Sequence, residues 1–252
     1  MVPTTHQWDL PTLPAKLSRA EVHVWRTGFE QAPGYIARLR RWMTPDEQGR
    51  AERFHFEKHR NQFIIARGTL RALLGGYLDM DPAAIRFAYS DHGKPSLSPE
   101  HGRDHVRFNI SHSHNLALLA FSEGRELGVD LEWMRDDVLE DRIAERFFSA
   151  EEVRTLDALP RELQREGFFN CWTRKEAYIK AIGEGLSMPL SRFVVTLTPG
   201  EPAALLSANG SPDDEEVSRW SIRELFPGAG YKGAVMAEGS DWDLRCWEWP
   251  AS

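Results

Sequence analysis

The sequence predicts an α+β protein made of two similar halves related by a pseudo-two-fold axis. A weak internal repeat with an offset of about 105 residues is the first observation behind this prediction. The others are helical stretches that recur in both halves and short strand-like segments around them. The repeat begins with two such segments, Val22 to Trp25 and Leu127 to Leu131.

The helices of the two halves begin in the same way. Thr44 and Ser149 are each followed three residues later by an acid, Glu47 and Glu152 respectively, which is the pattern of a capping box. A long apolar stripe then predicts a helix over 57–78 in the first half and over 162–182 in the second. Short strands are expected after each helix, at 85–87 and 191–193.

The C-terminal part reads as a series of short strands separated by turns rich in Gly, Pro, Asn and Asp. These strands are expected at 193–197, 203–206, 220–223, 233–236 and 244–247, and we expect them to form an antiparallel sheet. A boundary near 122–126 divides the chain into an N-terminal lobe, 1–122, and a C-terminal lobe, 123–252. Two lobes packed side by side create a cleft at their junction, and such a pseudo-dimer is expected to be a monomer.

The composition excludes several classes of protein. A formal net charge of −7 argues against nucleic-acid binding, although Arg38 to Arg71 forms one locally basic segment. The N-terminus has no continuous apolar run, and no stretch approaches the ~18 apolar residues of a membrane span, so a cytoplasmic protein is expected. Two cysteines, Cys171 and Cys246, give no disulfide framework, and Cys171 reads as a buried, inert thiol.

Acidic residues alternate with apolar ones from Leu127 to Trp133, so Asp130 and Glu132 share one face of a strand. Two carboxylates at this spacing can present oxygen ligands to a single Mg²⁺. The alternative is simply the wet face of a half-buried strand.

The helix predicted over 162–182 strengthens the prediction of a cation site. Glu176 can supply a third oxygen, and Lys180 lies one turn later, where it can reach a phosphate carried by the metal. An ordinary i, i+4 ion pair is the alternative for these two residues. Lys175 lies in the middle of the apolar stripe, so it either extends its charge to water or needs an acid or phosphate within reach.

Two loops complete the set of charged and polar segments. Asn109-Ile110-Ser111-His112-Ser113 carries hydroxyl and imidazole groups that could bind an anion, whereas loop histidines are otherwise ordinary surface residues. The turn Gly93-Lys94-Pro95 presents a cation, which is again commonly a plain surface feature.

In this order and at these separations, the four segments resemble the surfactin-type 4′-phosphopantetheinyl transferases. The resemblance runs from about Thr44 to Tyr231 and includes Trp172-x-x-Lys175-Glu176-Ala177-x-x-x-Lys180 followed by Gly183-x-Gly185-Leu186. It implies a two-lobed fold and transfer of the phosphopantetheine arm of coenzyme A to a serine of an apo acyl or peptidyl carrier protein. The other product would be 3′,5′-adenosine bisphosphate.

The resemblance also implies roles for individual residues. Asp130, Glu132 and Glu176 would hold Mg²⁺, or Mn²⁺, on the pyrophosphate, with Glu176 as the base for the serine and Lys180 stabilising the leaving charge. Coenzyme A would be bound by Arg50, Arg67, Gly93, Lys94, Pro95, Ser111, His112, Lys175 and Lys180. Within this set, the Gly-Lys-Pro turn would hold adenine, Ser111 and His112 would contact phosphate, and Arg50 with Arg67 would meet the 3′-phosphate.

One departure from the family concerns Glu47, which stands where a second basic residue is common, so the 3′-phosphate clamp would be weaker or would use Arg53 or Arg67 instead. The helix starting near Ser149 and the stretch including Leu186 and Met188 are candidate docking surfaces for carriers of fatty-acid, polyketide or peptide synthases; the sequence does not distinguish these. A non-catalytic binding module and a Mg²⁺-dependent phosphodiester hydrolase are the competing functions.

Overall fold

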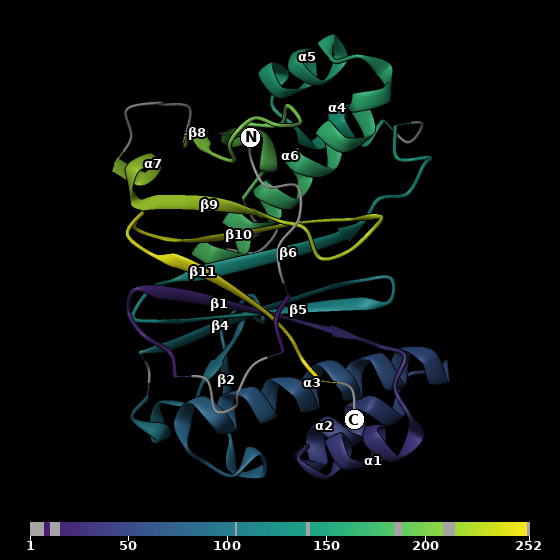
Figure 1. Cartoon of the computed structure of the whole chain (residues 1–252), viewed down its shortest axis with the longest axis vertical. Coiled ribbons are helices and arrows are strands. Elements are labelled where there is room, and N and C mark those ends of the chain that lie inside the picture. Colours follow the sequence, from purple (N-terminus) through teal and green to yellow (C-terminus); the bar gives the residue numbers. More distant parts are fainter. Residues whose placement is uncertain are drawn as a thin grey trace.

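The computed structural model describes residues 8–10, 16–103, 105–139, 142–183, 188–208 and 215–250. Two β-sheets lie at the centre of the molecule, and helices cover the outer face of each (Figure 1). One apolar cluster, which includes Val24, Leu118, Val129 and Val235, fills the space between the sheets. Separate clusters lie between each sheet and its helices.

The order of elements repeats along the chain. The first half contains β1 (Glu21–Gly28), α1 (Pro33–Arg41), α2 (Pro45–Glu52), α3 (Glu57–Leu78), β2 (Phe87–Tyr89), β3 (Pro95–Leu97), β4 (Val106–Ser113) and β5 (Leu116–Glu123). The second contains β6 (Leu127–Trp133), α4 (Ile143–Phe147), α5 (Ala150–Ala158), α6 (Arg161–Ile182), β7 (Val194–Val195), β8 (Leu205–Ser207), α7 (Glu215–Arg219), β9 (Trp220–Leu225) and β10 (Tyr231–Glu238). Apart from α7, each half is a strand, three helices and four strands, which confirms the predicted duplicated α+β fold.

Both predicted capping boxes are present. The Glu47 amide donates to Thr44 Oγ1 at 3.4 Å and the Thr44 amide donates to Glu47 Oε2 at 2.9 Å. The same reciprocal bonds join Ser149 and Glu152 at the start of α5. The predicted helix over 57–78 has these bounds in the structure, and the second long helix begins one residue earlier than predicted.

The strands predicted at 85–87 and 191–193 begin later in the structure, at Phe87 and at Val194. A 3-10 helix, Pro82–Ala84 in one half and Leu190–Arg192 in the other, takes up residues before the strand begins. Proline fixes φ and donates no backbone hydrogen bond, so Pro82 and Pro189 favour a tight turn at these points.

The last strand corrects the prediction of a purely C-terminal sheet. β11 (Asp243–Glu248) pairs in parallel with β1, so the sheets have the orders β11-β1-β5-β4 and β6-β10-β9. Trp247 of β11 packs on Trp25 and His23, with ring centroids 5.0 and 4.4 Å apart. A division of the chain at residue 122 therefore does not separate the two sheets completely.

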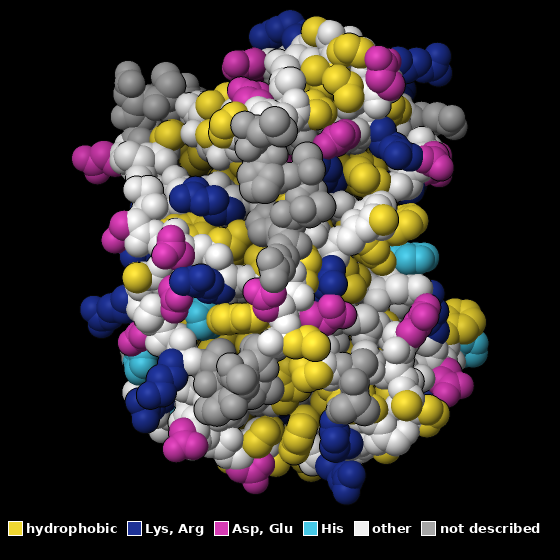
Figure 2. Space-filling model, in the orientation of Figure 1, with side chains coloured by type: hydrophobic (Ala, Val, Ile, Leu, Met, Phe, Trp, Pro, Cys, Tyr) yellow, Lys and Arg dark blue, Asp and Glu magenta, His cyan; other side chains and the backbone are white. Residues whose placement is uncertain are grey.

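Charges of both signs are mixed on the face seen in Figure 2, and Lys and Arg do not gather there into one positive patch. Both cysteines are buried free thiols, and burial raises the pKa of Cys171, as expected for an inert core residue. Across the described part of the chain, no helix combines the length and apolar character needed to cross a bilayer.

Helix α6 approaches strand β6 very closely at Gly128. A Cβ atom at this position would lie 2.1 Å from the carbonyl oxygen of Ala177 and 2.4 Å from the amide nitrogen of Ala181. These contacts are to backbone atoms, which cannot move aside as a flexible side chain would. Glycine at 128 therefore allows α6 to pack directly on the strand that carries Asp130 and Glu132.

We predict that Gly128→Ala lowers the free energy of unfolding by at least about 3 kcal/mol, because the added methyl group forces α6 away from β6. Urea unfolding measures the change. The matched control is Gly76→Ala in α3, where a Cβ meets nothing within 4 Å and alanine should stabilise the helix by roughly 0.5–1 kcal/mol. A Gly128→Ala protein as stable as the wild type would contradict the close contact.

Candidate active site

A cleft of about 230 Å³ brings together segments that are far apart in the sequence. Its walls come from the turn before β3, from β4 and from α6: His92, Gly93, Lys94, Pro95, Asn109, Ile110, Glu176, Ile179, Lys180 and Gly183. A neighbouring hollow of about 280 Å³ shares Lys94, Pro95 and Gly183 with it. Of the predicted site residues, the Gly-Lys-Pro turn, Glu176 and Lys180 thus line one cleft.

Asp130 lies beside this cleft and is only 2% exposed. Its Oδ1 accepts a hydrogen bond from Lys180 Nζ at 2.5 Å and another from the Ser111 hydroxyl at 2.9 Å. Its Oδ2 is buried and has no hydrogen-bond partner. A buried carboxylate oxygen without a donor is costly, so Asp130 is suited to a further cationic partner.

The two glutamates near Asp130 are both easier to protonate than usual. Burial and the Asp130 charge raise the pKa of Glu132 to about 7, even though Ser113 donates to Glu132 Oε2 at 2.9 Å. Burial, followed by repulsion from Asp130, also raises the pKa of Glu176. Acids that raise one another's pKa form a site in which a bound cation would be favoured.

The residues present therefore fit a divalent cation, although they do not form a finished set of ligands. Over the ranges that the structure describes, no three His, Cys, Asp or Glu side chains are gathered closely enough to hold a metal ion as they stand. Lys180 supplies the positive charge next to Asp130 in this arrangement. Oxygen donors of this kind suit Mg²⁺ or Mn²⁺.

Lys175 corrects one sequence-based assignment. Its side chain is fully buried and pairs with Glu152 at 2.8 Å, and its Nζ donates to the carbonyls of Leu190 and Phe193 at 2.8 and 2.5 Å. The partner that its charge requires is therefore an acid of the protein and not a phosphate of coenzyme A. One helical step away, Glu176 faces the cleft, because successive residues point about 100° apart around a helix.

Ser111 and His112 lie beside Lys180 but differ in their bonding. The Ser111 hydroxyl donates to Asp130 and accepts from Lys180 Nζ and from the Leu131 amide, so protein groups use its full bonding capacity. The predicted contact of Ser111 with phosphate stays a prediction. The His112 side chain has a large exposed surface, but its imidazole is partly shielded from water. This shielding and the nearby Lys180 charge lower the pKa of His112.

The side chain of Lys94 binds groups of the C-terminal lobe. Its Nζ donates to the carbonyl of Ala181 at 2.9 Å, near the C-terminus of α6, and lies 3.6 Å from Glu126 Oε2. Burial lowers the pKa of Lys94. A cation at a helix C-terminus is favourable, so Lys94 ties the turn to α6. Gly93, Lys94 and Pro95 also line the cleft.

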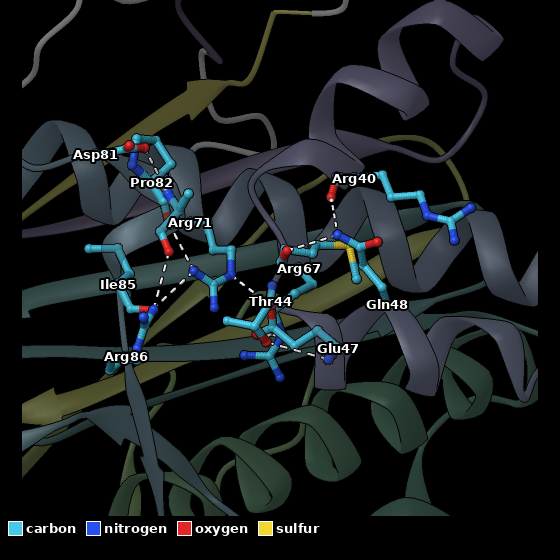
Figure 3. A network of polar contacts seen from close by, with 12 residues as sticks. Arg40, Thr44, Glu47, Gln48, Arg67, Arg71, Asp81, Pro82, Ile85 and Arg86 are labelled. Carbon is cyan, nitrogen blue, oxygen red and sulfur yellow. Dashed lines mark hydrogen bonds and ion pairs between the residues drawn. The ribbon is translucent and has the colours of Figure 1, made fainter.

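Glu47 arranges the arginines of α3. Arg71 donates through Nε to Glu47 at 2.8 Å and through Nη1 to the carbonyls of Pro82 and Ile85 (Figure 3). Arg67 Nε lies 3.5 Å from the same carboxylate, whereas its Nη1 is buried with no hydrogen-bond partner. The acid at position 47 therefore holds a pair of buried guanidinium groups in place, and one of them has a free donor.

The exposed Arg50 is next to this network. Its guanidinium lies over the ring of Phe63, 5.2 Å from the centroid, and that of Arg67 lies over Phe87 at 4.8 Å. Stacking of this kind limits where the guanidinium groups can point. Arg53, the other candidate for the clamp, is exposed at the end of α2.

Two family models and several curated relatives match the chain. A model of the 4′-phosphopantetheinyl transferase superfamily matches residues 126–235, and a model of the 4′-phosphopantetheinyl transferase N-terminal region matches residues 31–124. The 4′-phosphopantetheinyl transferase HetI of Nostoc sp. is 39% identical over 245 residues, which cover 97% of this chain and 99% of that protein.

The chain belongs to the 4′-phosphopantetheinyl transferase family. It is also similar to 4′-phosphopantetheinyl transferase Sfp of Bacillus subtilis, with 32% identity over 81% of this chain and 86% of that protein. In this transferase, Gly185 and Leu186 of the sequence motif lie outside the described residues.

Sequence reasoning missed two features of this 4′-phosphopantetheinyl transferase. It recognised Glu152 as a capping residue but not as the partner of Lys175, because the two lie on different helices. The segment from Asn109 to Ser113 was expected to bind an anion, and its contacts with the amides of β6 were not predicted. The signal was the alternation of Asn109 and Ser113 with Ser111 along one strand, which matches the alternation of Asp130 and Glu132.

We predict that Lys175→Met lowers the unfolding free energy of this 4′-phosphopantetheinyl transferase by about 3–5 kcal/mol, because it leaves Glu152 charged and buried without its partner. Urea unfolding measures the loss, and the folded variant should keep the wild-type KM for coenzyme A. Arg161→Met, at an exposed position of the same helix, is the matched control and should leave the stability and the KM near their wild-type values. An unchanged stability together with a raised KM for Lys175→Met would restore Lys175 as a coenzyme A ligand.

Proposed function

We propose that the protein transfers the 4′-phosphopantetheine arm of coenzyme A to a serine of apo acyl or peptidyl carrier proteins, releases 3′,5′-adenosine bisphosphate and requires Mg²⁺. The observation that carries the proposal is the buried Asp130, with one oxygen on Lys180 and the other without a partner, beside Glu176. The acids of this arrangement can bind a cation, and Lys180 can bind a pyrophosphate.

In the proposed reaction, the serine oxygen of the carrier attacks the β-phosphorus of coenzyme A. A bond forms between these atoms, and the bond from the β-phosphorus to the oxygen that bridges the two phosphates breaks. Glu176 takes the serine proton, directly or through water. Glu176 lines the cleft, which supports this role, because a general base must lie within reach of the proton that it takes.

Lys180 would bind the pyrophosphate, and the three acids would bind the cation. Lys180 is half-exposed at the cleft, so its ammonium can turn from Asp130 toward the pyrophosphate and neutralise the leaving charge. Asp130, Glu132 and Glu176 would hold the cation. When bound, Mg²⁺ would neutralise the pyrophosphate and polarise its oxygens.

The adenosine end of coenzyme A would bind at the N-terminal lobe. Gly93, Lys94 and Pro95 line the cleft, which supports adenine binding there. Arg67 would bind the 3′-phosphate through its unpartnered Nη1, with the exposed Arg50 as the second cation. Because Glu47 holds Arg67 in place, an acid at this position is compatible with an anion site.

The carrier protein would dock beside α4 and α5. A groove of about 170 Å³ lies there between Trp133, Val138, Ile143, Phe168 and Trp172, and Glu132 and Arg135 also line it. Phe147 and Leu139 in the same region are each 36% exposed. Because this protein is acidic overall, an apolar contact of this kind suits an acidic carrier better than a purely electrostatic one.

We predict that Glu176→Gln lowers the rate of transfer at least about 100-fold, because glutamine cannot accept the serine proton. The measurement is the intact mass of an apo carrier protein incubated with coenzyme A and Mg²⁺, with and without a chelator. The wild type should add one phosphopantetheine arm only when the metal is present.

Glu162→Gln, at an exposed position of the same helix, is the matched control and should act like the wild type. No mass gain on several carrier types with the wild type would refute the transferase. Release of 3′,5′-adenosine bisphosphate without a carrier would indicate a hydrolase instead.

A second prediction concerns the 3′-phosphate. Arg67→Gln should raise the KM for coenzyme A about 10- to 100-fold, the effect of losing a charged hydrogen bond to phosphate, and should change the KM for 3′-dephospho-coenzyme A much less. Steady-state kinetics with both substrates measure the difference. Arg53→Gln should change neither KM, and a selective effect of that variant would assign the clamp to Arg53.

A further inference from the structure

Strands β4 and β6 lie at the edges of their sheets, and these edges face each other across the junction of the two lobes. The backbone of β4 pairs with β5, and that of β6 pairs with β10. Side chains of β4 bind backbone amides of β6 at 3.0, 3.3 and 3.0 Å: Asn109 Oδ1 accepts from Val129, Ser111 Oγ from Leu131 and Ser113 Oγ from Trp133. We call Asn109, Ser111 and Ser113 the polar seam.

The regular spacing of the polar seam has a simple physical origin. Side chains at i and i+2 of a strand point the same way, and the backbone amides of alternate residues point to the same edge. Each contact joins residues 20 positions apart, so the two strands stay in register along the seam. The Val129 and Leu131 amides are buried, and buried amides without partners are costly, so Asn109 and Ser111 take the place of a neighbouring strand there. The bond between Ser113 and the Trp133 amide continues the same pattern at an exposed position.

The two hydroxyls of the seam also orient the acids of the site. A serine hydroxyl has one proton to donate. Ser111 accepts from the Leu131 amide and donates to Asp130 Oδ1, and Ser113 accepts from Trp133 and donates to Glu132 Oε2, both at 2.9 Å. Each serine therefore fixes the carboxylate that precedes the amide it binds.

We propose that Ser113 is a positioning residue of the active site: it holds the edge of β6 against β4 and orients the Glu132 carboxylate for the divalent cation. The role in cation binding rests on the proposed function, whereas the role in the seam does not. A change at Ser113 tests the orientation of a carboxylate alone. A change at Ser111 would also disturb Lys180, which Ser111 contacts and which acts in the proposed reaction.

Three variants test the proposal. Ser113→Ala removes the hydroxyl, and Ser113→Thr keeps it. Ser122→Ala is the matched control, because Ser122 is a buried serine on the adjacent strand β5 whose hydroxyl donates to the carbonyl of Arg125 at 2.6 Å, outside the site. Two readouts need neither coenzyme A nor a carrier: the hydrogen-exchange rate of the Trp133 amide, and the dissociation constant for Mn²⁺ from titration calorimetry.

Ser113→Ala should speed exchange of the Trp133 amide about tenfold relative to Ser122→Ala, and should weaken Mn²⁺ binding about 10- to 100-fold, as removal of a group that orients a metal ligand does. Its kcat should fall while its KM for coenzyme A stays near the wild-type value. Ser113→Thr should restore Mn²⁺ affinity. A purely structural serine would also speed exchange of the Trp133 amide and lower the unfolding temperature, but it would leave the Mn²⁺ affinity and kcat unchanged.

Ser113→Ala with the Mn²⁺ affinity of Ser122→Ala would overturn the proposal, as would a wild type that binds no Mn²⁺. A wild type that binds Mn²⁺ but transfers nothing would refute the proposed function alone. In that case, the exchange rate and the Mn²⁺ affinity of the variants would still support or overturn the role of Ser113.

Discussion

The position of the whole site depends on the close contact between α6 and β6 at Gly128. Since no side chain stands between them, the helix backbone rests directly on the strand, with a hypothetical Cβ only 2.1 Å from the nearest carbonyl oxygen. This contact brings Glu176 and Lys180 of the helix next to Asp130 of the strand. The edge of β6 that does not pair with β10 is held by side chains of β4. Helix α6 and the polar seam together therefore fix the strand that carries Asp130 and Glu132.

The buried charges fall into two groups with different consequences. Lys175 with Glu152 and Arg71 with Glu47 are satisfied within the protein, so they stabilise the arrangement of helices and turns. Asp130 and Arg67 each retain a buried polar atom without a partner. Under the proposed function, the Asp130 oxygen would face the cation and the Arg67 nitrogen would donate to the 3′-phosphate.

Much of the fold follows from local sequence signals. The capping boxes at Thr44 and Ser149 and the long helices predicted over 57–78 and 162–182 depend on contacts within a few residues, and the structure bears them out. The parallel pairing of β11 with β1 could not be predicted in this way, because it joins residues more than two hundred positions apart and its partner strand carries no local mark of the pairing.

The candidate site was predictable to a similar extent. Alternation in β6 placed Asp130 and Glu132 on one face, but the direction of Lys175 was not evident, because α6 is buried on most sides and its apolar pattern does not distinguish the cleft from the core. The recognition of a 4′-phosphopantetheinyl transferase depended on the joint resemblance of four motifs.

The most direct test of the account is a crystal structure of the protein with coenzyme A and Mn²⁺, in which anomalous scattering locates the metal. The account predicts one metal peak among the carboxylates of Asp130, Glu132 and Glu176, with Lys180 on the pyrophosphate and Arg67 on the 3′-phosphate. A metal peak away from Asp130, or a pyrophosphate that Lys180 does not contact, would contradict it.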